Sequence, residues 1–168
     1  MLRALQFALL LFYLSSVLPG GHGHSPHSGT GDLICRRCGT LITKASAVRE
    51  YRMVPQPKKS EKLLNTYNMT VVGVDTTINV LKNPAGYYFH VMAVDGADLH
   101  FQGDYVVSDT WYPGYRWRTC TCKECSQHAG WYFEEIGKPD SPKNFVGVVL
   151  DSVISSDAAE DLLKLPVW

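Results

Sequence analysis

The sequence lacks an excess of charge of either sign. Its 16 lysines and arginines balance 16 aspartates and glutamates, so the formal net charge is zero. Basic residues do not gather into a stripe of the kind that follows a nucleic-acid backbone. We therefore expect no nucleic acid among the partners of this chain.

Long hydrophobic runs are scarce as well. The apolar run over residues 4–14 is shorter than the roughly 20 residues that span a bilayer, and it lies between Arg3 and a stretch of small residues. A basic start, an apolar centre and a small-residue exit are typical of a secretory signal peptide. We predict a signal peptide over residues 1–21 and a flexible Gly/Ser/His-rich leader over residues 22–32. We also expect a secreted, extracellular protein that does not bind membranes.

Three catalytic signatures are missing from the sequence. It contains no glycine-rich phosphate loop, no G-x-S-x-G motif and no H-E-x-x-H motif. Cys120 and His128 are the one pair whose chemistry suits nucleophilic catalysis, but closeness in sequence does not establish geometry. By default, a single cysteine on a strand is a small buried hydrophobe. We interpret His128 as a residue of a pocket wall or as one that supports such a wall from behind.

Four of the five cysteines form two C-x-x-C pairs, Cys35 with Cys38 and Cys122 with Cys125. Four thiolates in such pairs suit a closed, tetrahedral structural zinc site. One zinc ion would then tie the start of the domain to its end. The alternative is disulfide bonds, because secretion places a protein in an oxidising compartment. A bridge within a C-x-x-C pair is, however, more typical of redox enzymes.

Aromatic residues gather in the segment 109–133, which holds three of the four tryptophans. Trp111 and Trp117 flank a Pro-Gly turn, which folds the segment back on itself. Trp131 and Phe133 are two residues apart, so on a strand they point to the same face. We predict that the four rings converge on a pocket beside the zinc site. The alternative is that they are core residues, because aromatic rings dominate core burial.

The rest of the composition favours strands and loops. Aromatic residues make up 11% of the chain, and it holds 14 glycines and 9 prolines. Residues rich in Val, Ile, Tyr and Phe predict strands over 70–74, 77–81, 87–94, 98–101, 117–121, 130–135 and a closing strand within 143–155.

Two polar segments complete the sequence-based assignment. Residues 43–68 are polar and charged and are predicted to form a long loop or an irregular hairpin. At its end, the triplet Asn68-Met69-Thr70 is an acceptor for N-linked sugar, so Asn68 is a predicted glycosylation site. Helical spacing of apolar residues predicts a short helix over 157–165.

These motifs together resemble the CULT domain, the thalidomide-binding domain of cereblon. The similar stretches are C-x-x-C at 35–38, N-P-x-G-Y at 83–87, W-Y-P-G-Y-x-W at 111–117, C-x-x-C at 122–125, H-x-G-W-x-F at 128–133 and S-P-x-x-F-x-G at 141–147. We identify residues 33–155 as a CULT domain and residues 156–168 as a C-terminal tail. The resemblance implies a mainly β fold, the β-tent, in which two antiparallel sheets are pinned by one structural zinc. It places that zinc on Cys35, Cys38, Cys122 and Cys125.

The resemblance also implies a binding site. In the family an aromatic cage surrounds a cyclic imide that backbone groups hold by its polar edge. The corresponding positions are the cage residues Trp111, Trp117, Trp131 and Phe133, the backbone positions Asp109 and Trp111, and the rim residue Asn83. Asp109 stands where cereblon has histidine, and Cys120 has no cysteine counterpart there.

The expected function is a non-enzymatic binding module for cyclic imides or ureides. Candidate ligands are glutarimide, hydantoin and uracil-like rings, and the cyclised imide ends of damaged proteins. The alternative is an oxidoreductase similar to the B-type methionine sulfoxide reductases, which share the β-tent. Cys120 would then be the nucleophile and His128 the general acid. A weaker alternative is an interaction protein that uses the cage to grip a peptide end.

Overall fold

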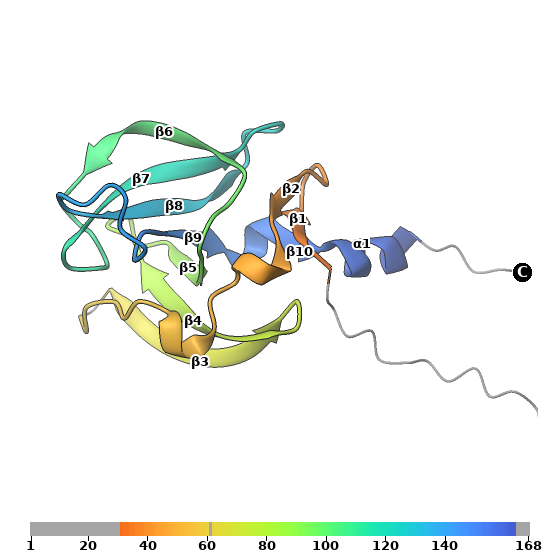
Figure 1. Ribbon diagram of the computed structural model, residues 1–168, viewed down its shortest axis with the longest axis horizontal. Coiled ribbons are helices and arrows are strands. Elements are labelled where there is room, and N and C mark those ends of the chain that lie inside the picture. The colour runs from red at the N-terminus through yellow and green to blue at the C-terminus, as the bar shows by residue number, and fades with distance from the viewer. Residues whose placement is uncertain (1–30, 61, 164–168) are drawn as a thin grey trace, which may run out of the picture.

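The computed structural model describes residues 31–60 and 62–163 (Figure 1). The predicted signal peptide and most of the predicted leader lie outside the described residues, as do residues 164–168 of the tail. Within the described part of the chain, no helix has the length and apolar character needed to cross a bilayer.

The fold is mainly β and consists of two antiparallel sheets, as predicted. The small sheet has the strand order β10-β1-β2 and the large sheet the order β3-β4-β5-β9-β8-β7-β6. The large sheet bends, with β3 and β4 at the bottom of Figure 1 and β6, β7 and β8 at the top. The strands are β1 (Leu33–Cys35), β2 (Leu41–Thr43), β3 (Leu63–Val71), β4 (Val74–Lys82), β5 (Tyr88–Val94), β6 (Leu99–Val106), β7 (Tyr115–Cys122), β8 (His128–Glu135), β9 (Phe145–Val149) and β10 (Val153–Ser155).

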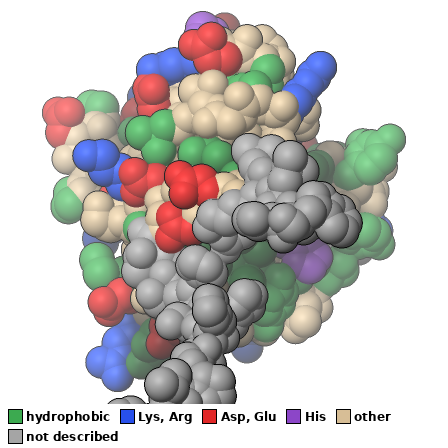
Figure 2. All heavy atoms as spheres, turned by 90° about the vertical axis from the view of Figure 1, so that its right-hand side faces the viewer, with side chains coloured by type: hydrophobic (Ala, Val, Ile, Leu, Met, Phe, Trp, Pro, Cys, Tyr) green, Lys and Arg blue, Asp and Glu red, His purple; other side chains and the backbone are tan. Residues whose placement is uncertain are grey.

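Helical structure is confined to short pieces within the described residues. They are the 3₁₀ turns η1 (Ala45–Ala47), η2 (Tyr51–Met53) and η3 (Leu150–Ser152) and the helix α1 (Ser156–Leu163). The helix lies where apolar spacing predicts one. On the face that carries α1, acidic side chains gather near the centre and basic ones are scattered around them (Figure 2).

The predicted closing strand within 143–155 is two strands rather than one. β9 lies between β5 and β8 in the large sheet, whereas β10 pairs with β1 in the small sheet. Between them the chain turns through η3, where the buried Ser152 hydroxyl donates a hydrogen bond to the carbonyl of Val149 at 2.6 Å. Asp151 and Ser152 interrupt the apolar pattern at this turn, but two polar residues alone do not show that the chain passes from one sheet to the other.

The prediction was also wrong around the β3–β4 hairpin. The predicted strand over 70–74 contains the hairpin turn, in which Val72 and Gly73 have φ values of 44° and 83°. Positive φ at both central residues is typical of a two-residue hairpin turn, but a β-branched valine there is unusual. The predicted loop over 43–68 ends early, because β3 begins at Leu63. The polar sequence of β3 agrees with its position at the edge of the large sheet.

The core has two layers, one on each side of β5 and β9. Alternate residues of a strand point to opposite faces, so Val146 and Val148 join one cluster while Phe145 and Val149 join the other. The first cluster lies under the small sheet and includes the cysteines Cys35 and Cys122. The second cluster includes the aromatic residues Trp111, Tyr112, Trp131 and Phe133. The core therefore positions both predicted sites.

Candidate metal centre and ligand-binding cavity

The four predicted zinc ligands lie together, and all of their sulfur atoms are within 4.8 Å of one another. The Sγ atoms of Cys35 and Cys125 are 3.7 Å apart, and those of Cys38 and Cys122 are 3.6 Å apart. A tetrahedral site with Zn–S bonds of about 2.3 Å has S–S edges of about 3.8 Å. All five cysteines are free thiols. The arrangement therefore fits a four-thiolate metal site better than the disulfide alternative.

Two backbone turns of the same form hold the ligands. In the first, the Gly39 amide donates to the Cys35 carbonyl at 2.8 Å, and Gly39 has a φ of 78°. In the second, the Ser126 amide donates to the Cys122 carbonyl at 3.0 Å, and Ser126 has a φ of 57°. The first turn can be predicted from the sequence because glycine readily adopts a positive φ, whereas serine gives no such indication of the second turn. Hydrogen bonding to Thr40 lowers the pKa of the Cys38 thiol to about 6, whereas the pKa of the neighbouring Cys125 thiol is raised to about 12. A metal ion bound by all four sulfur atoms would have to displace the proton on Cys125.

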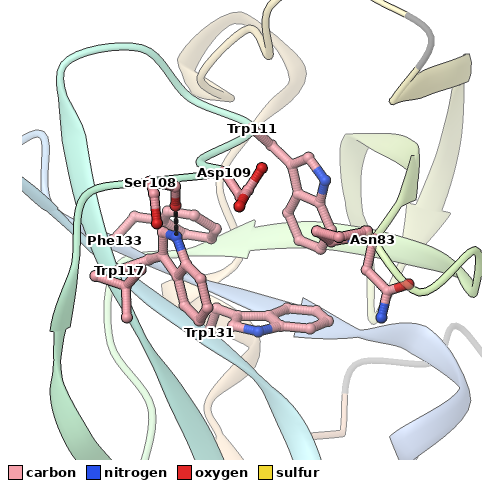
Figure 3. A pocket seen from close by; sticks show the side chains of 9 residues that line it. Asn83, Ser108, Asp109, Trp111, Trp117, Trp131 and Phe133 are labelled. Atoms are coloured by element: carbon pink, nitrogen blue, oxygen red, sulfur yellow. Dashed lines mark hydrogen bonds between the residues drawn. The ribbon is translucent and has the colours of Figure 1, made fainter.

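A cavity of about 280 Å³ opens beside β7 and β8 (Figure 3). All six residues predicted to bind a ligand line it, although they come from three separate parts of the chain. The lining also includes three residues that sequence reasoning did not single out. The complete set is Asn83, Pro84, Val106, Ser108, Asp109, Trp111, Trp117, Trp131 and Phe133.

Strand register brings the rings of β7 and β8 together. Trp117 on β7 lies directly opposite Phe133 on β8. Trp131 is two residues before Phe133 and shares its face of the sheet. Trp111 reaches the same space from the loop between β6 and β7. The predicted Pro-Gly turn is present, closed by a 3.1 Å hydrogen bond from the Tyr115 amide to the Tyr112 carbonyl.

The rings of Trp111, Trp117, Trp131 and Phe133, called the cage below, line the cavity. Trp111 and Trp131 are nearly perpendicular, with ring centroids 4.8 Å apart. The Trp111 indole N–H donates to the Lys82 carbonyl at 2.9 Å, and that of Trp117 to the Ser108 carbonyl at 3.0 Å (Figure 3). These two polar edges are thereby satisfied by the protein.

A layer of buried residues supports the cage. Phe133 stacks on Phe145 with ring centroids 4.9 Å apart, and Tyr112 packs edge-on against both. The Tyr112 hydroxyl accepts a 3.3 Å hydrogen bond from the buried Asn79 amide. Gly147 lies beneath Phe133, where a Cβ atom would come within 3.0 Å of its ring. The alternative that these rings belong to the core is thus correct in part, because they line the cavity and pack on the core.

Asp109 lies at the cavity wall and has a left-handed backbone conformation, with a φ of 56°. Its side chain forms an ion pair with Lys62 at 2.9 Å. Lys62 was not predicted, because it lies in the polar segment assigned to a loop. Within the described residues, no hydrogen-bond partner is found for the Asp109 carbonyl or the Trp111 amide, whereas the Trp111 carbonyl accepts from the Lys58 amide at 2.9 Å.

Asn83 lies at the rim of the cavity, in the turn between β4 and β5 (Figure 3). Its side-chain oxygen accepts a hydrogen bond from the Tyr87 amide at 2.9 Å, which stabilises the turn. The Asn83 carbonyl accepts from the Gly86 amide at 3.0 Å. The side-chain NH₂ group of Asn83 is therefore the part that can donate to a ligand.

Cys120 and His128 belong to different surroundings. Cys120 is fully buried in the first core cluster, and burial raises the pKa of its thiol to about 12. The His128 ring instead packs against Trp131 and Phe89, with ring centroids 4.6 and 6.0 Å away. Burial lowers the pKa of His128. A thiol that stays protonated at neutral pH is a poor nucleophile, so the geometry does not favour the Cys120–His128 pair as a catalytic pair. His128 does not line the cavity but packs behind the cage residue Trp131.

The predicted glycosylation site is on a strand rather than in a loop. Asn68 lies on β3, the edge strand of the large sheet, and its side chain is exposed. Its side-chain oxygen accepts a 2.8 Å hydrogen bond from the Thr77 hydroxyl.

No protein-family model matches the chain. Curated cereblon proteins align with part of it. The Drosophila melanogaster protein is 35% identical over 81 residues, which are 46% of this chain and 14% of the fly protein. The Danio rerio protein is 33% identical over 73 residues, which are 43% of this chain and 17% of the fish protein.

The chain therefore spans a small part of these relatives, and the likeness concerns one region of each. The predicted resemblance to cereblon is confirmed over that region. Together with the four-cysteine cluster and the buried aromatic residues, it fits a cereblon-like domain that binds a metal ion and a ligand.

Proposed function

We propose that this chain is a secreted binding module that holds one structural zinc ion and takes a cyclic imide or ureide into its aromatic cage. The observation that carries the proposal is the combination, at one cavity wall, of aromatic rings with a backbone acceptor and a backbone donor that have no hydrogen-bond partner among the described residues. Small-ligand sites typically combine an apolar lining with a few polar groups that set orientation.

The chemistry of an imide ring matches these two features. Its CH₂ groups or ring faces pack against the cage, as apolar groups do against aromatic side chains. Its N–H suits the Asp109 carbonyl as acceptor, and a neighbouring C=O suits the Trp111 amide as donor. One residue lies between these two groups in the sequence, and the backbone at Asp109 is left-handed. Asn83 supplies a further donor at the rim.

The cavity also limits the size of the ligand. Its volume of about 280 Å³ is at the lower end of small-molecule sites, which begin at roughly 300 Å³. A single five- or six-membered ring suits it, with any larger substituent outside the rim. Glutarimide, hydantoin and uracil-like rings and the cyclic imide end of a damaged protein satisfy this limit.

The proposed zinc has a structural role. A bound zinc ion would crosslink the chain through four thiolates. These four ligands would leave no coordination position open for a substrate. Cys35 and Cys38 contribute from the β1–β2 hairpin, and Cys122 and Cys125 from the β7–β8 hairpin. We propose no catalytic role for the chain, because the buried Cys120 thiol lies away from the cage.

Titration of the purified protein with glutarimide, hydantoin and uridine, followed by tryptophan fluorescence, tests the proposal. We expect saturable quenching by at least one compound, with a dissociation constant on the order of micromolar for so small a ligand. N-methylglutarimide is the matched control, because its methyl group removes the donor that faces the Asp109 carbonyl. Equal binding of glutarimide and its N-methyl derivative would refute the imide-edge mechanism.

A further inference from the structure

The charge around the cavity points to a second class of ligand. Asp109 is the only residue with a formal charge among the nine described residues that line the cavity. Its side chain lies between Trp117 and Trp111, on the opposite side of the cavity from Trp131 (Figure 3). An imide ring carries no charge that would use this carboxylate.

The cage provides a negative electrostatic surface of its own. The face of an aromatic ring is negative and its edge positive, so ring faces attract cations. Trp111 and Trp131 both line the cavity, with their ring planes at 84° to each other. The positive N–H edges of Trp111 and Trp117 are already bonded to the carbonyls of Lys82 and Ser108.

We propose that the cage also binds a methylated ammonium group, with the Asp109 carboxylate as its counter-ion. A quaternary ammonium is large, weakly hydrated and unable to donate hydrogen bonds, so ring faces and one carboxylate satisfy it. The inference is independent of imide binding, because it uses the ring faces and the Asp109 side chain rather than the backbone.

Lys62 modulates this site from outside the cavity. It contacts Oδ1 of Asp109 at 2.9 Å but is not among the lining residues. About half of the Asp109 side chain is exposed. The ion pair therefore weakens the negative potential of the cavity without filling the space in which a cation would sit.

The direct test compares choline with 3,3-dimethylbutan-1-ol, which has the same shape but carbon in place of the charged nitrogen. We expect choline to quench tryptophan fluorescence saturably and to bind at least about tenfold more tightly than the alcohol, the ratio that a desolvated cation–π contact gives. Equal affinities would show that the cage selects by shape alone and would overturn the proposal.

Two substitutions test the part played by charge. Asp109→Asn should reduce the ratio of choline to alcohol affinity, whereas an equal loss for both compounds would contradict a counter-ion role. Lys62→Met should tighten choline binding about two- to fivefold, the range of an exposed ion pair. Lys44→Met removes the same charge from an exposed position after β2 and should leave the affinity unchanged. If the two lysine substitutions changed choline affinity equally, the effect of Lys62 would come from the net charge of the protein. That result would contradict a local effect of the ion pair with Asp109.

Two further measurements separate sources and functions. Titration with Nα-acetyl-trimethyllysine amide beside choline shows whether a free metabolite or a modified side chain binds more tightly, and failure of both overturns the proposal. Choline binding without glutarimide binding would refute the imide proposal alone, and the reverse would refute the cation proposal alone. If both bind, they should compete, because they share one cavity. Simultaneous binding would place choline outside the cage and overturn the inference.

Discussion

The Sγ atoms of Cys38 and Cys122 lie 3.6 Å apart although 84 residues separate them in the sequence. Cys38 belongs to the β1–β2 hairpin of the small sheet and Cys122 to the end of β7 in the large sheet. A metal bound between them joins the two sheets. Because such a site does not exist in the unfolded chain, metal binding contributes to the free energy of folding.

We expect the purified protein to contain about one zinc ion per chain and to unfold when a strong chelator removes it, because structural zinc supplies folding free energy. Metal analysis and circular dichroism before and after chelation check this. Cys120→Ser is the matched control and should keep its zinc. Native protein that contains no metal and two disulfides within the C-x-x-C pairs would contradict the prediction.

Removing a cage ring should weaken ligand binding. Trp117→Ala and Trp131→Ala should each weaken glutarimide binding by about 2 kcal/mol or more, as for a desolvated aromatic contact. Trp117 is the sharper test, because it is partly exposed while Trp131 also packs in the core. Calorimetric titration measures the loss, and Trp117→Phe should restore part of it. Folded variants with normal affinity would show that the rings serve only the core.

Gly147→Ala should disturb the cage from beneath. The new Cβ would lie 2.9 Å from Val91 Cγ1 and 3.0 Å from the Phe133 ring, so at least one side chain must move. Overpacking of this kind costs about 1–3 kcal/mol of stability. We expect a lower thermal midpoint and weaker glutarimide binding. Gly96→Ala, at a position without a positive φ and with no atom within 4 Å of the new Cβ, should leave glutarimide affinity unchanged.

Stability should depend on pH through His128. Burial lowers the pKa of His128 in the folded state below the value of about 6.5 expected when unfolded. The unfolded chain therefore binds more protons, and stability is retained above about pH 6.5 and falls as the pH drops through the folded pKa. Denaturation midpoints of wild type and His128→Gln between pH 5 and 8 check this. The variant should show a shallower dependence, whereas parallel curves would assign the effect to other groups.

Asn68 should carry an N-linked sugar when the chain is secreted from a eukaryotic cell. Its side chain is exposed on the edge strand β3, which is accessible to a bulky modification. Mass spectrometry before and after treatment with a glycan-removing enzyme measures this, and Asn68→Gln should abolish the mass shift. An unchanged mass of the wild-type protein would reject the site.

Local chemistry was sufficient to predict much of this protein. The C-x-x-C spacing predicted the four clustered cysteines, since two thiols on one tight turn can face the same ion. Alternation along a strand predicted that Trp131 and Phe133 share a face, and the Pro-Gly pair predicted the turn that returns Trp117. These features depend on backbone geometry over a few residues, so they can be read without the fold.

Tertiary structure decided the features that depend on distant partners. The ion pair of Lys62 with Asp109 depends on the start of β3 within a polar segment. Because β3 is an edge strand, its sequence does not show the alternation of apolar and polar residues from which a strand is predicted. The predicted closing strand is split into β9 and β10 because its first part pairs within the large sheet and its last part pairs within the small sheet. Burial is the main reason why the Cys120 thiol has a raised pKa, because the pKa of a thiol follows its surroundings. Residue type predicts which chemistry a side chain can do, but only packing determines which neighbours and how much water it meets.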